Sequence, residues 1–187
     1  MKFLFSLLFL ILITISCIPQ KEVFTDYSYE GDFRNYKTYA FVNNYYEEGE
    51  INHNLIPVFE KFITQNLQAQ GYEYSKVSPD LLVNYKFYND HLNLSAANQP
   101  RLAQWLKRCN DEEPGEDNYN LHAQKLKKGA VLISIFDNHN RVHIWQGYSS
   151  GKLQNNGYPD LKYLRASVSQ IFSEYRILAR GYMASAR

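Results

Sequence analysis

The 187-residue sequence is poor in the residues and charges on which several classes of protein depend. Its two cysteines are too few for a disulfide framework or for a four-ligand cysteine site for zinc. Its formal net charge of +1 lacks the basic excess that a nucleic-acid-binding surface needs. Methionine and tryptophan occur only twice each. These shortages favour a single globular domain that relies on its own hydrophobic core, and they predict no nucleic-acid partner.

Tyrosine is the residue that the sequence has in excess, with 16 Tyr beside 11 Phe. Aromatic residues are enriched in half-buried strands, and tyrosine is also favoured at interfaces. The excess therefore has two interpretations, packing within a sheet and contact with a partner or ligand.

Residues 1–16 have the pattern of a secretory signal peptide. A positive Lys2 precedes an apolar run over residues 3–15, which is shorter than the roughly 20 residues that a membrane-spanning helix needs. A small residue, Ser16, then precedes Cys17. This ending resembles the bacterial lipoprotein signal, in which the cysteine is acylated, with palmitate or a similar chain, and becomes the new N-terminus. We therefore predict lipidation at Cys17.

A short tether, residues 17–22, follows the predicted lipidation site. Two or more acyl chains hold a protein stably on a membrane, so we expect an outer-membrane location through a lipid anchor. Gln20-Lys21-Glu22 partly resembles the signal that exports some Bacteroidetes lipoproteins to the cell surface. A solvated tether explains these residues equally well, so the periplasmic face and the cell surface both stay open.

Residues 23–177 contain the periodic patterns of one α+β domain, and residues 178–187 are interpreted as a tail. Alternating or continuous apolar residues predict strands at 23–29, 36–42, 81–88, 130–136 and 142–148, and residues 72–77 are either a short strand or a connection. Apolar residues at helical spacing predict helices at 55–70 and 160–177. The order β-β-α-β-β-β-β-α predicts a mostly antiparallel sheet with both helices packed on one face.

An inserted segment at about 95–128 interrupts this layout, because a structureless connection of such length is rare inside a compact domain. Residues 100–109 form an amphipathic pattern that places Trp105 and Cys109 on the apolar side. We expect the insertion to pack over the sheet or to reach a partner. Trp105 is accordingly either a packing anchor or a partner contact.

No group of residues has the arrangement of a catalytic or metal site. His139 and His143 flank a predicted hairpin turn, whereas a metal-binding pair at that spacing needs a helix. Nothing near Cys109 in the sequence indicates a lowered pKa and a reactive thiol. Gly147 is interpreted as a strand-end glycine. We therefore expect no enzymatic activity, no cofactor and no metal.

Three motifs, in this order along the chain, resemble the DUF4136 family of bacterial envelope lipoproteins. They are DFRNYKTYAF at residues 32–41, PDLLVNY at 79–85, and GAVLISIFD at 129–137 with Trp145-Gln146-Gly147 after it. The resemblance covers about residues 23–177 and departs in the insertion and the tail. It implies a fold and an envelope location and supplies no catalytic residue.

Two functions of different classes fit these observations. The first is a non-enzymatic outer-membrane lipoprotein that acts as an accessory subunit of a larger envelope complex, of the β-barrel assembly or transport type. Its membrane contact is the acyl anchor, its partner is another outer-membrane protein, and its expected contacts are Tyr45, Tyr46, Trp105 and Tyr119. The alternative is a ligand- or glycan-binding module with stacking platforms at exposed Tyr45, Tyr46, Tyr119 and Tyr148.

Overall fold

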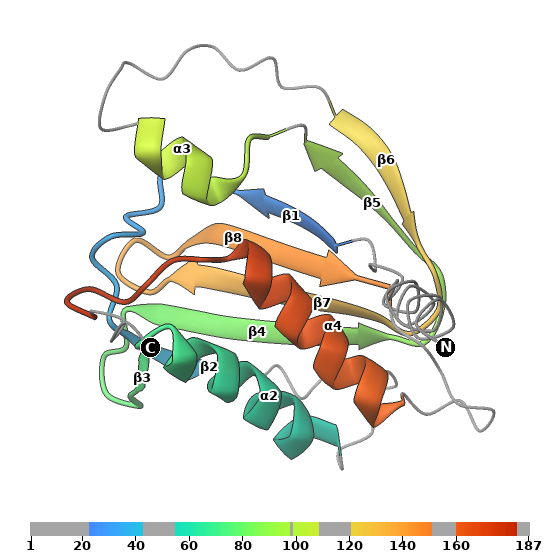
Figure 1. The fold of residues 1–187 in the computed structure, drawn as a ribbon, viewed down its shortest axis with the longest axis horizontal. Helices are drawn as coiled ribbons and strands as arrows, with labels where there is room; N and C mark the ends of the chain where they lie inside the picture. Colours follow the sequence, from blue (N-terminus) through green and yellow to red (C-terminus); the bar gives the residue numbers. More distant parts are fainter. Residues whose placement is uncertain (1–22, 43–54, 98, 109–120, 151–159, 183–187) are drawn as a thin grey trace, which may run out of the picture.

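The computed structural model describes residues 23–42, 55–97, 99–108, 121–150 and 160–182 (Figure 1). These residues form one large sheet, a separate two-stranded hairpin and three helices. In chain order the elements are β1 (Val23–Tyr27), β2 (Thr38–Phe41), α2 (Ile56–Ala69), β3 (Glu73–Tyr74), β4 (Leu81–Tyr88), β5 (Leu92–Ala97), α3 (Leu102–Arg108), β6 (Leu121–Leu126), β7 (Ala130–Asp137), β8 (Val142–Ser149) and α4 (Leu161–Glu174). No helix within these ranges is both long enough and apolar enough to cross a membrane.

The large sheet has the strand order β1-β8-β7-β4-β2-β3. Its first four strands pair antiparallel, whereas β2 runs parallel to both β4 and β3. The predicted α+β class with a mostly antiparallel sheet is confirmed. β1 and β2 follow each other in the sequence, yet β8, β7 and β4 lie between them. The chain between β1 and β2 must therefore cross one end of the sheet.

Helices α2 and α4 lie side by side on one face of this sheet (Figure 1). In α2, the buried side chains Phe59, Ile63 and Leu67 recur every four residues, which places them on one stripe. Asp160 caps the start of helix α4, and its side chain accepts a 2.9 Å hydrogen bond from the Lys162 backbone N–H. Both helices were predicted, but α4 ends three residues before the expected position.

The chain after α4 turns back into the core, which explains the early end of that helix. Tyr175 is fully buried, and Ile177 and Ala179 are also buried in the main core. The Ala179 N–H donates to the Gln70 carbonyl at 2.9 Å, and the Arg180 N–H donates to the Tyr36 carbonyl at 2.8 Å. The first residues of the predicted tail are thus part of the packed domain.

The insertion supplies a second, smaller core on the opposite face of the sheet. Strands β5 and β6 pair antiparallel from Leu92 opposite Leu126 to Ala97 opposite Leu121. Leu126, Ala130 and Tyr148 are its buried residues. The partly buried side chains packed against them are Phe24, Tyr88, Leu92, Leu94 and Leu132. Alternate residues of β4 and β7 point to this face, as the two-residue period of a strand requires.

The insertion also closes the outer edge of β1. The side-chain amide of Gln99 accepts a hydrogen bond from the Tyr27 N–H at 3.0 Å and donates one to the Tyr27 carbonyl at 2.8 Å. The Tyr27 hydroxyl donates to the Pro100 carbonyl at 3.0 Å. These bonds occupy polar groups that an edge strand would otherwise expose.

Gly147 is the third residue from the end of β8, and its close surroundings explain why a glycine stands there. A Cβ atom at this position would lie 2.5 Å from Cη2 of Trp145 and 2.6 Å from Cγ2 of Ile171. Helix α4 therefore packs on β8 so closely that there is room for only a hydrogen atom. The requirement comes from tertiary packing, which a local turn signal does not report.

Candidate functional site at the β7–β8 turn

Three of the sequence motifs meet at one end of the sheet, around the turn between β7 and β8. We call this place the motif corner and define it by Asp32, Tyr36, Asp80, Asp137 and His139. The crossing segment after β1 contributes the first two residues, the start of β4 contributes Asp80, and β7 with its turn contributes the last two. Segments more than 100 residues apart in the chain are thus joined by side-chain hydrogen bonds.

Asp137 is the buried centre of the motif corner, with 2% of its surface exposed. One carboxylate oxygen, Oδ1, accepts from the backbone N–H groups of His139 at 2.8 Å and Asn140 at 3.0 Å. The other, Oδ2, accepts from the Tyr36 hydroxyl at 2.8 Å and the Asn140 side-chain amide at 3.0 Å. Burial raises the pKa of Asp137, but these hydrogen bonds outweigh it and lower the pKa overall. The carboxylate therefore stays ionised and is occupied on both oxygens.

Asp80 ties β2 to the start of β4. Its Oδ2 accepts from the backbone N–H groups of Lys37 and Thr38, both at 2.8 Å, and from the Thr38 hydroxyl at 3.0 Å. Burial raises the pKa of Asp80, but these bonds and the contact with His139 outweigh it and lower the pKa overall. The arrangement fixes the parallel register in which Tyr39 lies opposite Leu81. Asp80 thus has a structural use, like Asp137.

A hollow of about 450 Å³ lies next to the motif corner, on the sheet face opposite α2 and α4. Leu82 and Phe136 lie opposite each other in the β4–β7 register and form part of its apolar wall. The full lining is Val42, Leu82, Asn84, Phe136, Asp137, Asn138 and Arg141. The β5–β6 hairpin covers other residues of this face, so the described part of the insertion leaves the hollow uncovered.

Arg141 supplies the positive charge at the rim of the hollow. Its backbone has a φ of 56°, in the left-handed region that costs a side-chain-bearing residue about 1–2 kcal/mol. Glycine or asparagine is the usual residue there. The side chain is exposed and forms no ion pair with any residue that the structure describes. A strained arginine beside an apolar hollow is suited to binding an anionic group that is joined to an apolar one.

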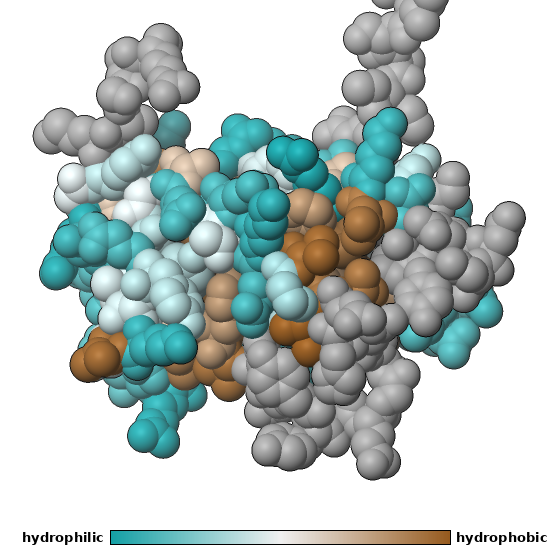
Figure 2. Space-filling view, turned by 90° about the horizontal axis from the view of Figure 1, so that it is seen from below, coloured by the Kyte–Doolittle hydropathy of each residue, from teal (hydrophilic) through white to brown (hydrophobic). Residues whose placement is uncertain are grey.

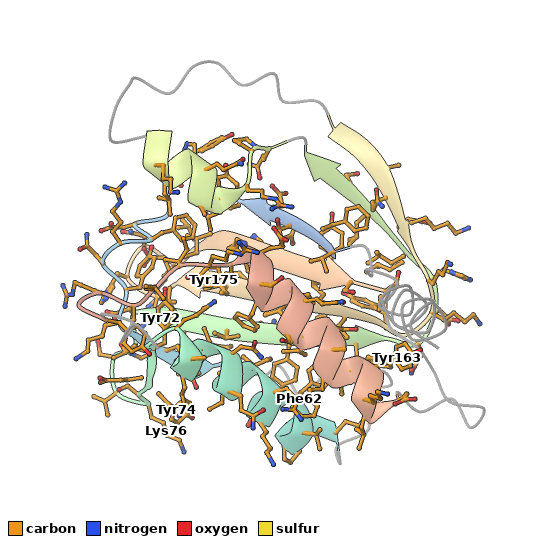
Figure 3. The ribbon with its side chains drawn as sticks, in the orientation of Figure 1. Phe62, Tyr72, Tyr74, Lys76, Tyr163 and Tyr175 are labelled. Atoms are coloured by element: carbon orange, nitrogen blue, oxygen red, sulfur yellow. The ribbon has the colours of Figure 1, made fainter. Side chains whose placement is uncertain are left out.

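Most of the tyrosines within the described residues are buried. Tyr72 and Tyr175, labelled in Figure 3, lie between α2 and the chain after α4, with their hydroxyl oxygens 3.2 Å apart. Burial raises the pKa of Tyr72 to about 12 and that of Tyr175 well above its usual value. Five further buried tyrosines are Tyr27, Tyr36, Tyr39, Tyr85 and Tyr148. The packing interpretation is therefore confirmed for these residues.

The residues predicted to act as sites fall into two groups. Cys17, Tyr45, Tyr46 and Tyr119 lie outside the described residues. Trp105 is half-buried, with its ring centroid 5.5 Å from that of Tyr27 and 5.2 Å from that of Tyr29. It holds α3 against the sheet, which is the role of a packing anchor.

The prediction of an exposed ring at Tyr148 is wrong. Tyr148 has 0% of its surface exposed and stacks on Phe24, with ring centroids 5.6 Å apart. Its strand position places it under the β5–β6 hairpin, whose pairing the sequence pattern did not show. His139 contacts Asp80 at 3.3 Å, whereas His143 packs on Phe136, so the two histidines serve different contacts. Among the described residues no three His, Cys, Asp or Glu side chains converge as a metal site would require.

Sequence reasoning missed Arg141 and the hollow beside it. The available signal was a four-residue connection, residues 138–141, between two strands. Such a loop needs a left-handed residue near its end, and an arginine there is unusual.

Comparison with known proteins identifies a family and distant structural likenesses. The chain matches the family described as "Domain of unknown function (DUF4136)" over residues 23–175. No protein of curated function matches it in sequence. A PDZ domain protein from Parabacteroides distasonis is similar in structure at 18% identity and a TM-score of 0.46; the match covers 89% of this chain but only 37% of that protein.

Two crystal forms of the PelC dodecamer from Paraburkholderia phytofirmans are also similar, each at 11% identity. The TM-scores are 0.42 for a variant with a single substitution, with 84% of this chain and 98% of that one covered, and 0.44 for the other form, with 86% and 99% covered.

Proposed function

This chain belongs to the DUF4136 family, and from that premise we propose that it is a lipid-anchored, non-enzymatic accessory subunit of an outer-membrane complex. It docks an acidic segment of a partner in the hollow beside Arg141. The observation that carries the proposal is an exposed, strained arginine next to an apolar hollow of about 450 Å³. A partner carboxylate would pair with the guanidinium, and a neighbouring apolar side chain would lie against Leu82 and Phe136.

The chemistry of the motif corner supports a binding role. A general acid or base needs a free lone pair or proton within reach of a substrate. Both oxygens of Asp137 already accept hydrogen bonds, and the pKa of each aspartate, Asp80 and Asp137, is lowered rather than brought towards neutrality. These carboxylates hold the turn that presents Arg141.

The predicted acylation at Cys17 supports the membrane part of the proposal. The described domain begins at Val23, so only five residues, 18–22, separate the predicted anchor Cys17 from β1. A domain tethered so closely meets membrane-bound partners at a high effective concentration. In the alternative of a glycan-binding module, Tyr148 cannot serve as a stacking platform, because its ring is buried.

The docking proposal is tested by NMR titration of the protein with two short probes. One is N-acetyl-Leu-Asp-amide, which joins an apolar side chain to a carboxylate, and the other is the uncharged N-acetyl-Leu-Asn-amide. We expect the acidic probe to bind about tenfold more tightly, since a charge-assisted hydrogen bond contributes about 1.5 kcal/mol. The shifts should centre on Leu82, Phe136 and Arg141.

Arg141→Gly should remove this preference and make the protein about 0.5–1 kcal/mol more stable, because glycine adopts the left-handed backbone without strain. Ser78→Gly is the matched control. Ser78 also has a positive φ, 47°, and does not line the hollow. That control should gain stability and keep the preference for the acidic probe. Equal binding of both probes to the unmodified protein would overturn the docking proposal.

A further inference from the structure

Three exposed lysines gather at the end of the sheet opposite the motif corner. We call Lys125, Lys127 and Lys128 the lysine corner. They occupy the end of β6 and the short connection into β7. Gly129, with a φ of 80°, completes this connection, and its N–H donates to the Tyr88 carbonyl at 2.8 Å. The lysines are therefore held at the last residue of β4, whereas the motif corner lies at its first.

The sheet register places the lysine corner next to the start of the domain. The Lys127 N–H donates to the Ser150 hydroxyl at 3.1 Å. Ser149, the preceding residue, lies opposite Val23 of β1 on one side and Val131 of β7 on the other. Because β8 lies between them, β7 and β1 are two strand spacings apart, which is about 10 Å. Through the Ser150 contact, Lys127 lies near the residue at which the tether joins the domain.

The tether limits how far this end can move from a membrane. Its six residues, 17–22, span at most about 20 Å even when fully extended. Because Lys127 lies near Val23, the lysine corner is within reach of the headgroups whenever Cys17 is anchored. The motif corner is about 25 Å farther along the eight-residue strand β4.

The two ends of the sheet differ in the charged side chains that they combine. At the lysine corner, Lys128 pairs with Asp90 at 3.3 Å, and the Lys125 and Lys127 side chains form no ion pair within the described residues. The motif corner contains three aspartates, Asp32, Asp80 and the buried Asp137, and it lies beside the exposed cations Lys37 and Arg141, so its charges are mixed. An anionic membrane attracts nearby lysines and repels carboxylates, and both effects act within a Debye length of about 8 Å.

We propose that the lysine corner rests on the headgroups of anionic phospholipids, so that the sheet stands on the membrane with the motif corner and its hollow pointing away. This inference rests on the proposed lipid anchor and adds an orientation to it. The acyl chains hold the protein to any bilayer, whereas the lysines determine which end of the sheet faces an anionic bilayer.

The first test uses the full acylated protein on two kinds of vesicle, one of phosphatidylcholine alone and one with phosphatidylglycerol added. Lysine side chains are labelled with a membrane-impermeant amine reagent and read by mass spectrometry. We expect labelling of Lys125, Lys127 and Lys128 to fall about fivefold on the anionic vesicles, the factor that corresponds to one lysine near such a surface. Labelling of Lys37 and Lys76 should stay unchanged; Lys76 lies at the far end in Figure 3. Salt at about 1 M should restore the lost labelling, because it shortens the Debye length to about 3 Å.

A second measurement reads orientation directly. A fluorescent donor is placed at Val77, which is 83% exposed, through Val77→Cys in a Cys109→Ser background, and the acceptor is a headgroup-labelled lipid. Energy transfer should be lower on anionic than on neutral vesicles. Replacing all three lysines of the corner by Gln should abolish this difference. The matched double variant Lys37→Gln, Lys76→Gln should keep it.

The outcomes separate the inference from the anchor. If the protein floats with both kinds of vesicle but shows equal lysine labelling and equal energy transfer on each, the orientation proposal is overturned and the anchor stands. If the protein floats with neither, Cys17 carries no anchor and both proposals fail.

Discussion

The two faces of the sheet are built by different means. On one face, α2 and α4 cover a core whose largest buried side chains include Trp145, Tyr39 and Tyr72, and Figure 1 shows both helices lying across the strands. On the other face, the β5–β6 hairpin covers only part of the surface, and a hollow opens beside Arg141. The helical face is thus used for stability, and the partly covered face has room for a ligand or partner.

The space-filling view shows a side of the molecule on which apolar residues are exposed. Figure 2 looks from below Figure 1, onto the side of the molecule at which α2, β2 and β3 lie, and apolar atoms reach the surface there. Exposed hydrophobic residues on this side include Tyr74 and Val77, on and just after the short strand β3. The hollow differs from this side because Arg141 adds a positive charge to an apolar wall, which is what a specific anionic partner needs.

The largest expected difference between the faces is in the loss of stability on substitution, and two adjacent residues of β7 test it. Ile133 is fully buried under the helices, whereas Leu132 is half-buried on the other face. We expect Ile133→Ala to lower the free energy of unfolding by about 3–4 kcal/mol and Leu132→Ala by about 1 kcal/mol. Urea denaturation followed by circular dichroism measures both. Equal losses would show that the second face is packed as tightly as the first.

A smaller effect is expected at the motif corner. Asp137→Asn removes the charge that accepts four hydrogen bonds, so we expect a loss of about 2–3 kcal/mol near neutral pH. Because the pKa of Asp137 is lower in the folded protein, its contribution is fully present above the unfolded pKa of about 3.9. The contribution is lost as the pH falls through the lower folded value.

The stability difference between the unmodified protein and Asp137→Asn should therefore narrow below about pH 4. Denaturation curves at several pH values between neutrality and acid measure this difference. Asp90→Asn is the control, because Asp90 is exposed and pairs only with Lys128 among the described residues. A difference that stayed constant into the acid range would contradict the assigned role of the Asp137 carboxylate.

The smallest effect concerns the buried tyrosine pair on the helical face. Tyr72→Phe removes one hydroxyl and leaves the Tyr175 hydroxyl without its 3.2 Å partner. We expect a loss of about 1 kcal/mol, since one buried hydrogen bond is broken while the ring still fills its space. Burial raises the pKa of both Tyr72 and Tyr148 to about 12, so ultraviolet titration of the folded protein should lose one of these two late-ionising tyrosines. Tyr74→Phe, at an exposed ring, should leave stability unchanged.

Local patterns predicted the elements of the helical face well. The strand at 81–88 has the predicted bounds, and α2 differs from its predicted range by one residue at each end, because periodic apolar residues determine both. Pairing over long distances was harder to predict. The sequence does not show that β1 pairs with β8, or that the insertion forms a hairpin over Tyr148.

The candidate site was the least predictable part, for a physical reason. Arg141 is distinguished by its backbone conformation and by the hollow beside it, and both depend on strands that meet only in the folded protein. The motif residues Asp80 and Asp137 were recognised as part of a family resemblance. Their role, which is to fix a turn through occupied carboxylates, follows from hydrogen bonds to segments far away in the chain.

The pairing of β1 with β8 has a consequence for the time course of folding. Val23 pairs with Ser149, so nearly the whole domain must be synthesised before the first strand finds its neighbour. Closing so long a loop is entropically costly and slow compared with forming local hairpins such as β7–β8. Gln99, which closes the outer edge of β1, is itself 72 residues away from Tyr27 in the chain, so this contact also closes a long loop. The segment next to the tether is thus among the last to join the sheet.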